Sequence, residues 1–462
     1  MGSKVPIYMS FRLYNITNKE DVYNGKKPIL NELGPYTYLE KREKVSFNFS
    51  GNGEDLLYQE RKSFYYDPTK SVGDPMKDKI ITTLAGNLER HAWVEKFFGL
   101  IAIEDLFIEK TVHDMLWGYE DDLLTELCDL FSVMCESKTM GLLVGMNYTI
   151  GPITSIDTGI KELSTIGKIV KYNNMTKLNI WSSDAANSIN GSGHLCIRIF
   201  NLILDGTMFK PMLSKHDTAY VFASDVCRSF VFEFKQTVTA SNDNRVTLYQ
   251  FVGSKKQAQN ASINPDNAGF CPKESVTDKC PPGGLMDLSS CKGKGSLLVP
   301  LFASQPHFYL AEPWVTDPYE GIVPGSEADS TVLNIEPTLG IPLEAYKRLQ
   351  FNFYLKSQDA LKKYFKKMPH KEYFFPLFWL EEGATSDKQT LGQLYDKVLF
   401  IPKAVSTISF VGQIVGPIVL LVCVLSAVLV FIRIRRPIKA VEIQNESSQP
   451  MLSDVSLLLN TS

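Results

Sequence analysis

Residues 404–432 read AVSTISFVGQIVGPIVLLVCVLSAVLVFI, a run without a formal charge. At about 1.5 Å per residue, a helix of this length exceeds the roughly 30 Å hydrocarbon core of a bilayer. A buried helix of a soluble protein rarely runs this long without a charge, which makes that alternative the weaker one. The run therefore predicts a transmembrane helix, and the rest of the chain is interpreted around it.

The residues after this run indicate its orientation. Four basic residues follow at once: Arg433, Arg435, Arg436 and Lys439. Positive charge beside a transmembrane segment is typical of its cytosolic side. We therefore expect residues 1–403 outside the cell or in a lumen, residues 404–432 in the membrane, and residues 433–462 as a cytosolic tail.

Six N-glycosylation sequons precede the membrane segment, which fits an exported surface. Their asparagines are Asn15, Asn48, Asn147, Asn174, Asn190 and Asn260. Residues 1–11 contain no basic region followed by an apolar region, so no signal peptide is recognised there. We expect a translocation segment upstream of the printed sequence, and a tail anchor formed by residues 404–432 is the alternative.

The cysteines also favour an oxidising compartment. Four of the eight cysteines, Cys227, Cys271, Cys280 and Cys291, lie close together in the sequence. The chain has no C-x-x-C pair, which disfavours a zinc ribbon or a thioredoxin-like redox site. We expect two disulfides among the four, although the sequence alone allows three connectivities.

Strand patterns dominate residues 1–403. Residues 349–356, LQFNFYLK, alternate between apolar and other side chains with the period of a strand. Residues 230–234 and 245–249 predict a hairpin around residues 241–244. Residues 77–134 differ, because their apolar side chains recur at helical spacing. These helices are either a satellite of the β core or an exposed apical bundle that captures a partner.

Catalysis and nucleic-acid binding have little support. The six histidines show no metal-ligand spacing, and the glycine-containing stretches match neither a P-loop nor a nucleophile elbow. We therefore expect no catalytic residues, no metal and no cofactor, and a secretory hydrolase is only the third hypothesis. The net charge of −3 argues against a nucleic-acid partner.

The C-terminal tail contains a candidate sorting signal. Asp454, Leu458 and Leu459 fit an acidic dileucine pattern, D-x-x-x-L-L, in a polar segment. Such a segment can be bound by endocytic adaptors because it is short, cytosolic and disordered. The alternative is chance, since leucine-rich hexamers are common. The signal favours endosomal and lysosomal membranes over the plasma membrane alone.

Several sequence blocks, taken in order, resemble the class B scavenger receptor family over almost the whole chain. They are GPYTY at 34–38, LWGY at 116–119, DVCRS at 225–229, DNAGFC at 266–271, PHFY at 306–309, NIEP at 334–337 and KRLQ at 347–350. The block at 266–271, with the cysteines that follow it, resembles the lysosomal branch of that family most closely.

The resemblance implies an antiparallel β-barrel topped by an apical helical bundle, mainly β with α, and a C-terminal transmembrane helix. It implies an apolar tunnel that passes lipid to the membrane, lined by inward-facing residues such as those at 349–355. Fatty acids, sterols, phospholipids or lipoproteins would be the partners. A lysosomal protein cargo bound by the apical helices is the alternative. The resemblance also implies that Cys227 pairs with Cys291 and Cys271 with Cys280.

Two departures from the family pattern stand out. Residues 193–204 separate Asn190 from a later Asp-Gly-Thr, where the family has one continuous motif. These residues are interpreted as an insertion or an unspliced intron. In addition, Ala186 and Gly269 stand where some relatives have a pair of cysteines, which indicates the loss of a whole disulfide.

Overall fold

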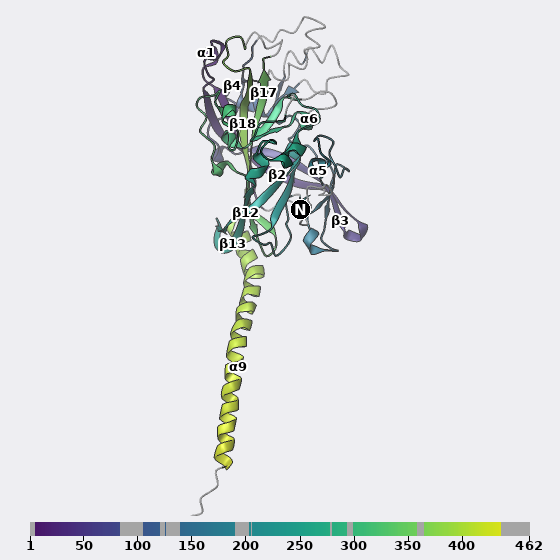
Figure 1. Ribbon diagram of the computed structural model, residues 1–462, viewed down its shortest axis with the longest axis vertical. Coiled ribbons are helices and arrows are strands. Elements are labelled where there is room, and N and C mark those ends of the chain that lie inside the picture. The colour runs from purple at the N-terminus through teal and green to yellow at the C-terminus, as the bar shows by residue number, and fades with distance from the viewer. Residues whose placement is uncertain are drawn as a thin grey trace, which may run out of the picture. The chain divides into compact units, whose positions relative to one another are not determined.

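The computed structural model describes residues 5–83, 105–120, 125, 139–189, 203–204, 206–277, 280–292, 299–357 and 365–435 (Figure 1). The chain divides into two compact units, Met1–Tyr395 and Asp396–Ser462. The first unit contains the β structure, and the second contains one long helix. The expected mainly β class is confirmed.

The first unit is built on one large sheet, in which almost all neighbouring strands are antiparallel. The strand order is β10-β11-β12-β13-β16-β17-β18-β1-β2-β3-β8-β9, and β15 joins it beside β17. The strands are β1 Ile7–Ile16, β2 Leu30–Ser50, β3 Asp55–Tyr66, β4 Lys79–Thr82, β5 Ile108–Thr111, β6 Tyr119–Glu120, β7 Thr139–Met140, β8 Thr154–Asp157, β9 Ile169–Tyr172, β10 Ile203–Leu204, β11 Thr218–Ala223, β12 Arg228–Ala240, β13 Asp243–Gly253, β14 Leu285–Asp287, β15 Leu301–Ser304, β16 Val332–Glu336, β17 Ile341–Lys356 and β18 Glu372–Thr385.

The long antiparallel pair of β17 and β18 forms the centre of the sheet. The predicted strand at residues 349–356 is confirmed as the second half of β17. Its polar positions do not face water, because Gln350 and Asn352 are fully buried. Gln350 Nε2 donates to Asn352 Oδ1 at 2.8 Å, and Asn352 Nδ2 donates to Ser304 Oγ at 3.1 Å. This half of β17 is therefore buried on both faces.

The predicted hairpin is confirmed as β12 and β13. The connection is tighter than expected, because Ala240 pairs with Asp243 and leaves only Ser241 and Asn242 between the strands. Asn242 Nδ2 donates to the carbonyl oxygen of Ser386 at 2.8 Å, which attaches the turn to the segment after β18.

The two ends of the sheet contact each other by packing of apolar side chains and not by backbone hydrogen bonds among the described residues. Among the described residues, β9 and β10 at the two ends are not hydrogen-bonded to each other, so the sheet is open. Ile169 of β9, Ile189 and Phe222 of β11 form one apolar cluster, and the rings of Tyr172 and Phe222 are 5.4 Å apart. The sheet therefore curves back on itself, but the closed barrel is not confirmed.

The helices of the first unit are short. They are α1 Lys19–Tyr23, α3 Val112–Trp117, α5 Asp184–Asn187, α6 Ser289–Lys292, α7 Pro313–Thr316 and α8 Lys388–Leu394. The helical prediction for residues 77–134 is correct at α3 but wrong at β4 and β5. The run KIIT of β4 is rich in β-branched residues, which favour a strand. Residues 84–104, 121–124 and 126–138, where most of the apical bundle was predicted, lie outside the described residues.

The second unit contains α9, Phe400–Arg435 (Figure 1). It is longer than the uncharged run, because it continues through Arg433 and Arg435. Within it, residues Thr407–Arg435 are long and apolar enough to cross a membrane by length and composition. The large apolar side chains of this stretch are exposed, as those of a helix facing lipid would be.

Candidate functional site

One face of the central strands carries large apolar side chains in register. Phe351 pairs with Phe378, Leu349 pairs with Leu380, and Phe11 of β1 lies opposite Leu380. The rings of Phe351 and Phe378 stack with centroids 5.1 Å apart. All five side chains are at most 8% exposed. We call this surface the apolar face, and it contains two of the side chains predicted to line a tunnel, Leu349 and Phe351.

Segments distant in sequence cover the apolar face. Met115 and Leu116 of α3 and Val226, at the end of a 3-10 helix (Ser224–Val226), pack into the same cluster. Leu288, which follows β14, joins this cluster, and Ala303 of β15 extends the apolar face itself because it pairs with Phe351. The sequence pattern of α3 alone does not indicate which strands it covers.

Charged side chains follow on the same face. Lys347 pairs with Glu382 in register, two residues along from the Leu349–Leu380 pair, so both side chains lie on the apolar face. Lys347 Nζ contacts the Asp225 carboxylate and lies 3.7 Å from Glu382 Oε2. This group thus joins β17 and β18 to the segment that precedes Cys227.

Two residues of β2 extend this group. Arg42 forms ion pairs with Glu382 and with Glu40, the latter at 2.8 Å between Nε and Oε1. We call Glu40, Arg42, Asp225, Lys347 and Glu382 the charged cluster. The side chains of Lys347 and Asp225 are 29% and 35% exposed, so solvent reaches the cluster.

Opposite charges within the cluster favour the ionised forms of Asp225, Lys347 and Glu382. The charge of Lys347 holds the pKa of Asp225 well below its usual value. Burial alone would lower the pKa of Lys347, but the carboxylates of Asp225 and Glu382 raise it above its usual value. Burial likewise opposes ionisation of Glu382, but Arg42 and Lys347 lower its pKa to about 2. These three groups therefore stay charged at physiological pH and form a polar zone.

A second apolar cluster begins beyond the charged cluster. Ala345, two residues from Lys347 on the same face, pairs with Ala384 and with Leu333. Ala345 packs against a buried cluster that includes Leu333 and Phe251. One continuous face therefore presents an apolar zone, a charged zone and a second apolar zone. Sequence reasoning missed the charged zone because its members come from four distant segments.

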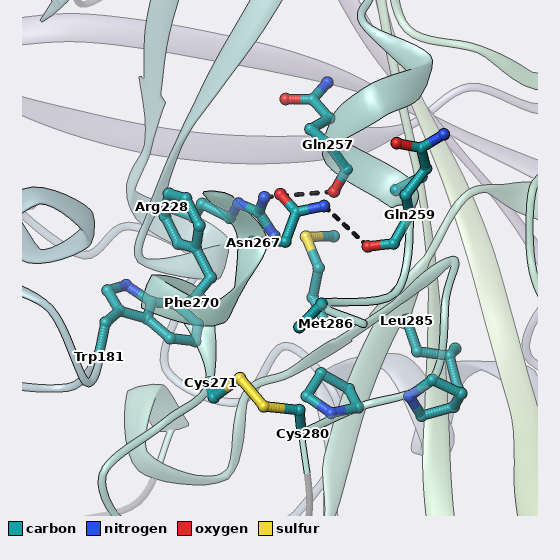
Figure 2. A pocket seen from close by; sticks show the side chains of 14 residues that line it. Trp181, Arg228, Gln257, Gln259, Asn267, Phe270, Cys271, Cys280, Leu285 and Met286 are labelled. Carbon is teal, nitrogen blue, oxygen red and sulfur yellow. Dashed lines mark hydrogen bonds between the residues drawn. A yellow bond between two sulfur atoms is a disulfide. The ribbon is translucent and has the colours of Figure 1, made fainter. Parts of the chain in front are cut away.

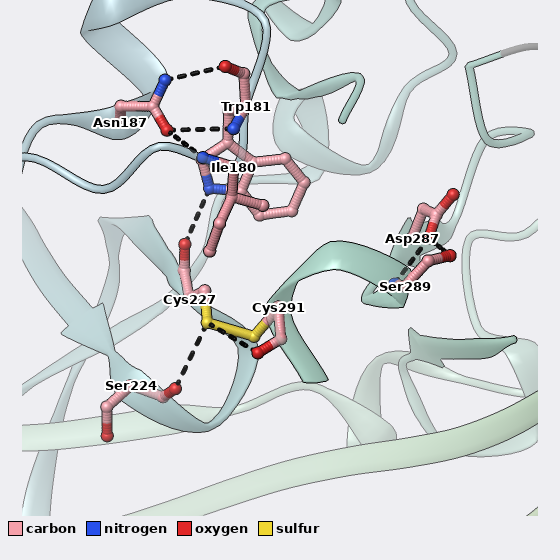
Figure 3. The surroundings of a disulfide bond; sticks show 8 residues. All are labelled: Ile180, Trp181, Asn187, Ser224, Cys227, Asp287, Ser289 and Cys291. Atoms are coloured by element: carbon pink, nitrogen blue, oxygen red, sulfur yellow. Dashed lines mark hydrogen bonds between the residues drawn. A yellow bond between two sulfur atoms is a disulfide. The ribbon is translucent and has the colours of Figure 1, made fainter. Parts of the chain in front are cut away.

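Two disulfides hold the region next to the charged cluster. Cys227 is bonded to Cys291, and Cys271 is bonded to Cys280, which is the pairing that the family resemblance implies. Figure 3 shows that Trp181 lies over the first bond, and its Nε1 donates to the carbonyl oxygen of Cys227 at 2.7 Å.

A small cavity lies beside the second disulfide (Figure 2). Its volume is about 20 Å³, and Arg228, Asn267 and Phe270 are among the residues that line it. Arg228 follows Cys227 directly, so the cavity and the Cys227–Cys291 bond belong to one region.

The predicted sequons differ in accessibility. Asn48 and Asn174 are exposed, whereas Asn15, Asn147 and Asn260 are half-buried. Each of the half-buried three makes a side-chain hydrogen bond, with Ile81 N, Phe64 N and Glu312 Oε1 respectively. Asn190 lies outside the described residues, as do the tail residues Asp454, Leu458 and Leu459.

His307 is a polar centre that sequence reasoning missed. Its Nε2 lies 2.9 Å from Glu32 Oε2, and its Nδ1 lies 2.9 Å from Asp329 Oδ1. Trp379 Nε1 also donates to Glu32 Oε2, at 3.0 Å. A single histidine has no spacing pattern, and the only sequence signal at this position is the family block PHFY, which includes it. Within the described ranges, no three His, Cys, Asp or Glu side chains are grouped as a metal site.

Comparison with known proteins identifies the family. The profile of the CD36 family matches residues 2–427, which is most of the chain. The chain belongs to the CD36 family. It is a membrane protein of that family with an apolar C-terminal helix.

Two groups of relatives are similar to this CD36-family chain over most of its length. Scavenger receptor class B member 1 of Rattus norvegicus is 29% identical over 428 residues, covering 90% of this chain and 78% of the relative. Lysosome membrane protein 2 of Rattus norvegicus is 32% identical over 398 residues, covering 84% and 77%. The human Lysosome membrane protein 2 is also 32% identical over 398 residues.

Proposed function

We propose that this protein is a membrane-anchored scavenger receptor that binds lipids or lipoproteins and passes lipid to the membrane. The observation that carries the proposal is the match to the CD36 family over residues 2–427, together with the similarity to Scavenger receptor class B member 1. That membership supports a receptor role for this chain. Fatty acids, sterols and phospholipids are the candidate lipids.

The apolar face is the proposed path for lipid within the first unit. Its aromatic and aliphatic side chains suit an acyl chain or a sterol, and the charged cluster suits a polar head group that remains hydrated. Lipid would move between the covering segments and the sheet, so the proposed tunnel requires side chains to separate there. The zones on either side of Lys347 support this route.

The experiment that tests the proposal is lipid analysis of the purified full-length protein. We expect about one lipid per chain after detergent purification, extraction and mass spectrometry. Ala384→Trp places a large ring in the second apolar zone, next to the charged cluster, and we expect it to reduce the bound lipid severalfold. Thr385→Trp is the matched control, because adjacent strand residues point to opposite faces.

The outcome also separates this proposal from its main alternative. Lipid no higher than in an unrelated single-span protein purified in the same way would contradict it. That result would favour a trafficking receptor for a protein cargo, the alternative that the resemblance to the lysosomal branch of the family implies. The predicted cargo site, the apical helices, lies mostly outside the described residues.

We further propose the topology in which residues 1–403 are lumenal or extracellular and residues 433–462 are cytosolic. The basic residues after residue 432 and the six sequons support this arrangement. Lysosomal or endosomal membranes, the plasma membrane, or both would then hold the protein, with endocytic adaptors binding the tail at Asp454, Leu458 and Leu459.

A further inference from the structure

Arg228, the first residue of β12, is a buried cation without a balancing carboxylate among the described residues. Arg228 is only 6% exposed. Burial lowers the pKa of Arg228 to about 10, and no charge in the part of the chain that the structure describes offsets this effect. The guanidinium still carries its positive charge at physiological pH. By contrast, Lys347 and Arg42 in the charged cluster each contact two carboxylates.

The described contacts of Arg228 leave one donor unused. Nη2 donates to the carbonyl oxygen of Gln257 at 3.3 Å, and the guanidinium carbon lies 3.8 Å from the centre of the Phe270 ring. The buried Nε has no hydrogen-bond acceptor within the described residues. A desolvated cation–π contact offsets only part of the free-energy cost of burying an unpaired charge. The protein's own groups therefore balance this charge incompletely.

The cavity next to Arg228 limits what can balance the charge. Figure 2 shows Arg228, Asn267 and Phe270 together at this cavity, with the Cys271–Cys280 bond nearby. Its volume of about 20 Å³ compares with the roughly 10–15 Å³ that one water molecule requires. A monoatomic anion fits this space.

We propose that the Arg228 cavity is a binding site for a monoatomic halide, held against Arg228 Nε. Chloride is the halide expected outside the cell or in a lumen. Its negative charge satisfies the unused donor and neutralises the guanidinium, and the ring of Phe270 keeps the pair out of water. Chloride thereby stabilises the junction of the two disulfides, because Arg228 follows Cys227 and the cavity is lined by Cys271 and Cys280. This site is independent of the proposed lipid path.

The first test is thermal unfolding of the full-length protein in sodium chloride and in sodium gluconate at equal ionic strength. Gluconate is too large for the cavity, so only chloride raises the stability through binding. We expect the melting temperature to increase with chloride and to level off as the site saturates, with bromide acting in the same way. Arg228→Met should abolish the difference between the two salts. Arg348→Met is the control that should keep it, because Arg348 Nε donates to Glu381 Oε2 at 2.6 Å.

The second test does not depend on a variant that folds. Anomalous diffraction from wild-type crystals grown in sodium bromide should place a bromide beside Arg228 Nε. Equal melting in both salts, or the absence of bromide there, would overturn the proposal. Asp278→Asn removes a carboxylate from the sequence between Cys271 and Cys280, and it should leave the wild-type chloride effect unchanged because chloride neutralises Arg228. A chloride effect that emerges only in this variant would mean that Asp278 balances Arg228, and would equally overturn the proposal.

Discussion

Three buried or half-buried basic side chains of this protein differ in how carboxylates balance their charge. Lys347 forms ion pairs with Asp225 and Glu382. Arg228 has no carboxylate partner among the described residues. The ring of His307 lies between the carboxylates of Glu32 and Asp329. The hydrogen bond to Glu32 raises the pKa of His307, and Asp329 adds to this effect, while burial opposes it. His307 thus connects three segments that are distant in sequence.

The raised pKa of His307 predicts a pH-dependent stability. A group with a higher pKa in the folded state contributes stability that is fully present below its unfolded pKa, about 6.5, and is lost as the pH rises through its folded pKa. Urea unfolding at a series of pH values should show that the wild type loses stability above about pH 6.5. His307→Asn should therefore reduce this loss. Asparagine suits the positive φ of 54° at this position.

His216→Asn is the control for this measurement, because His216 is exposed and its side chain makes no hydrogen bond among the described residues. The control should keep the wild-type pH profile. An unchanged profile in His307→Asn would mean that the two carboxylates do not bind the protonated ring more tightly than the neutral ring.

Gly269 and Ala186 provide a second prediction at the scale of single residues. A Cβ atom built on Gly269 would lie 3.7 Å from Ala186 Cβ, within the roughly 3.5–4.5 Å typical of a disulfide. Ala186→Cys combined with Gly269→Cys should therefore form a third disulfide. The chain-entropy model gives a stabilisation of about 4.5 kcal/mol for this loop as an upper limit. Displacement of the Ser183 hydroxyl, which contacts the new Cβ position and caps α5, reduces that value.

Peptide mapping and thermal unfolding with and without a reductant would detect this bond. The single variants Ala186→Cys and Gly269→Cys are the controls, and their stability should not depend on the reductant in this way. Two free thiols in the oxidised double variant would contradict the prediction.

At the scale of elements, the sequence predicted those strands whose pattern is local. The hairpin of β12 and β13 followed from two strand-like runs and a polar turn, and the turn differed only in length. The error at β4 arose because Ile80 lies at helical spacing from apolar residues further along the chain. Ile80 instead pairs with Lys110 of β5. That partner, thirty positions away, is not visible in the local period.

The acidic dileucine pattern of the C-terminal tail predicts where the full-length protein resides. If the dileucine pattern is a sorting signal, Leu458→Ala together with Leu459→Ala should increase the fraction of full-length protein at the plasma membrane severalfold, because adaptors lose the two side chains that they bind. Surface biotinylation and immunofluorescence measure this fraction. Leu457→Ala is the matched control, since Leu457 occupies a spacer position of the pattern. A wild-type distribution in the double variant would favour chance as the origin of the pattern.

At the scale of the whole molecule, the sequence indicated the membrane helix and the mainly β class from composition and period. The family resemblance added the pairing of the four cysteines. The charged cluster could not be predicted, because Arg42 and Glu382 come together only when β1 and β18 pair. Closure of the sheet could not be predicted either. It depends on whether the end strands exchange hydrogen bonds or only pack side chains, as Tyr172 and Phe222 do.

The position of β1 between β2 and β18 has a consequence for biosynthesis. β1, Ile7–Ile16, leaves the ribosome before β2, which can pair with it soon afterwards. Its other neighbour, β18 (Glu372–Thr385), is made more than 350 residues later in the chain. At about 5–20 residues per second, this edge waits roughly 20–70 s with unpaired backbone groups. An exposed apolar edge is a site of aggregation. We therefore expect a chaperone to cover this edge of β1 until translation reaches β18.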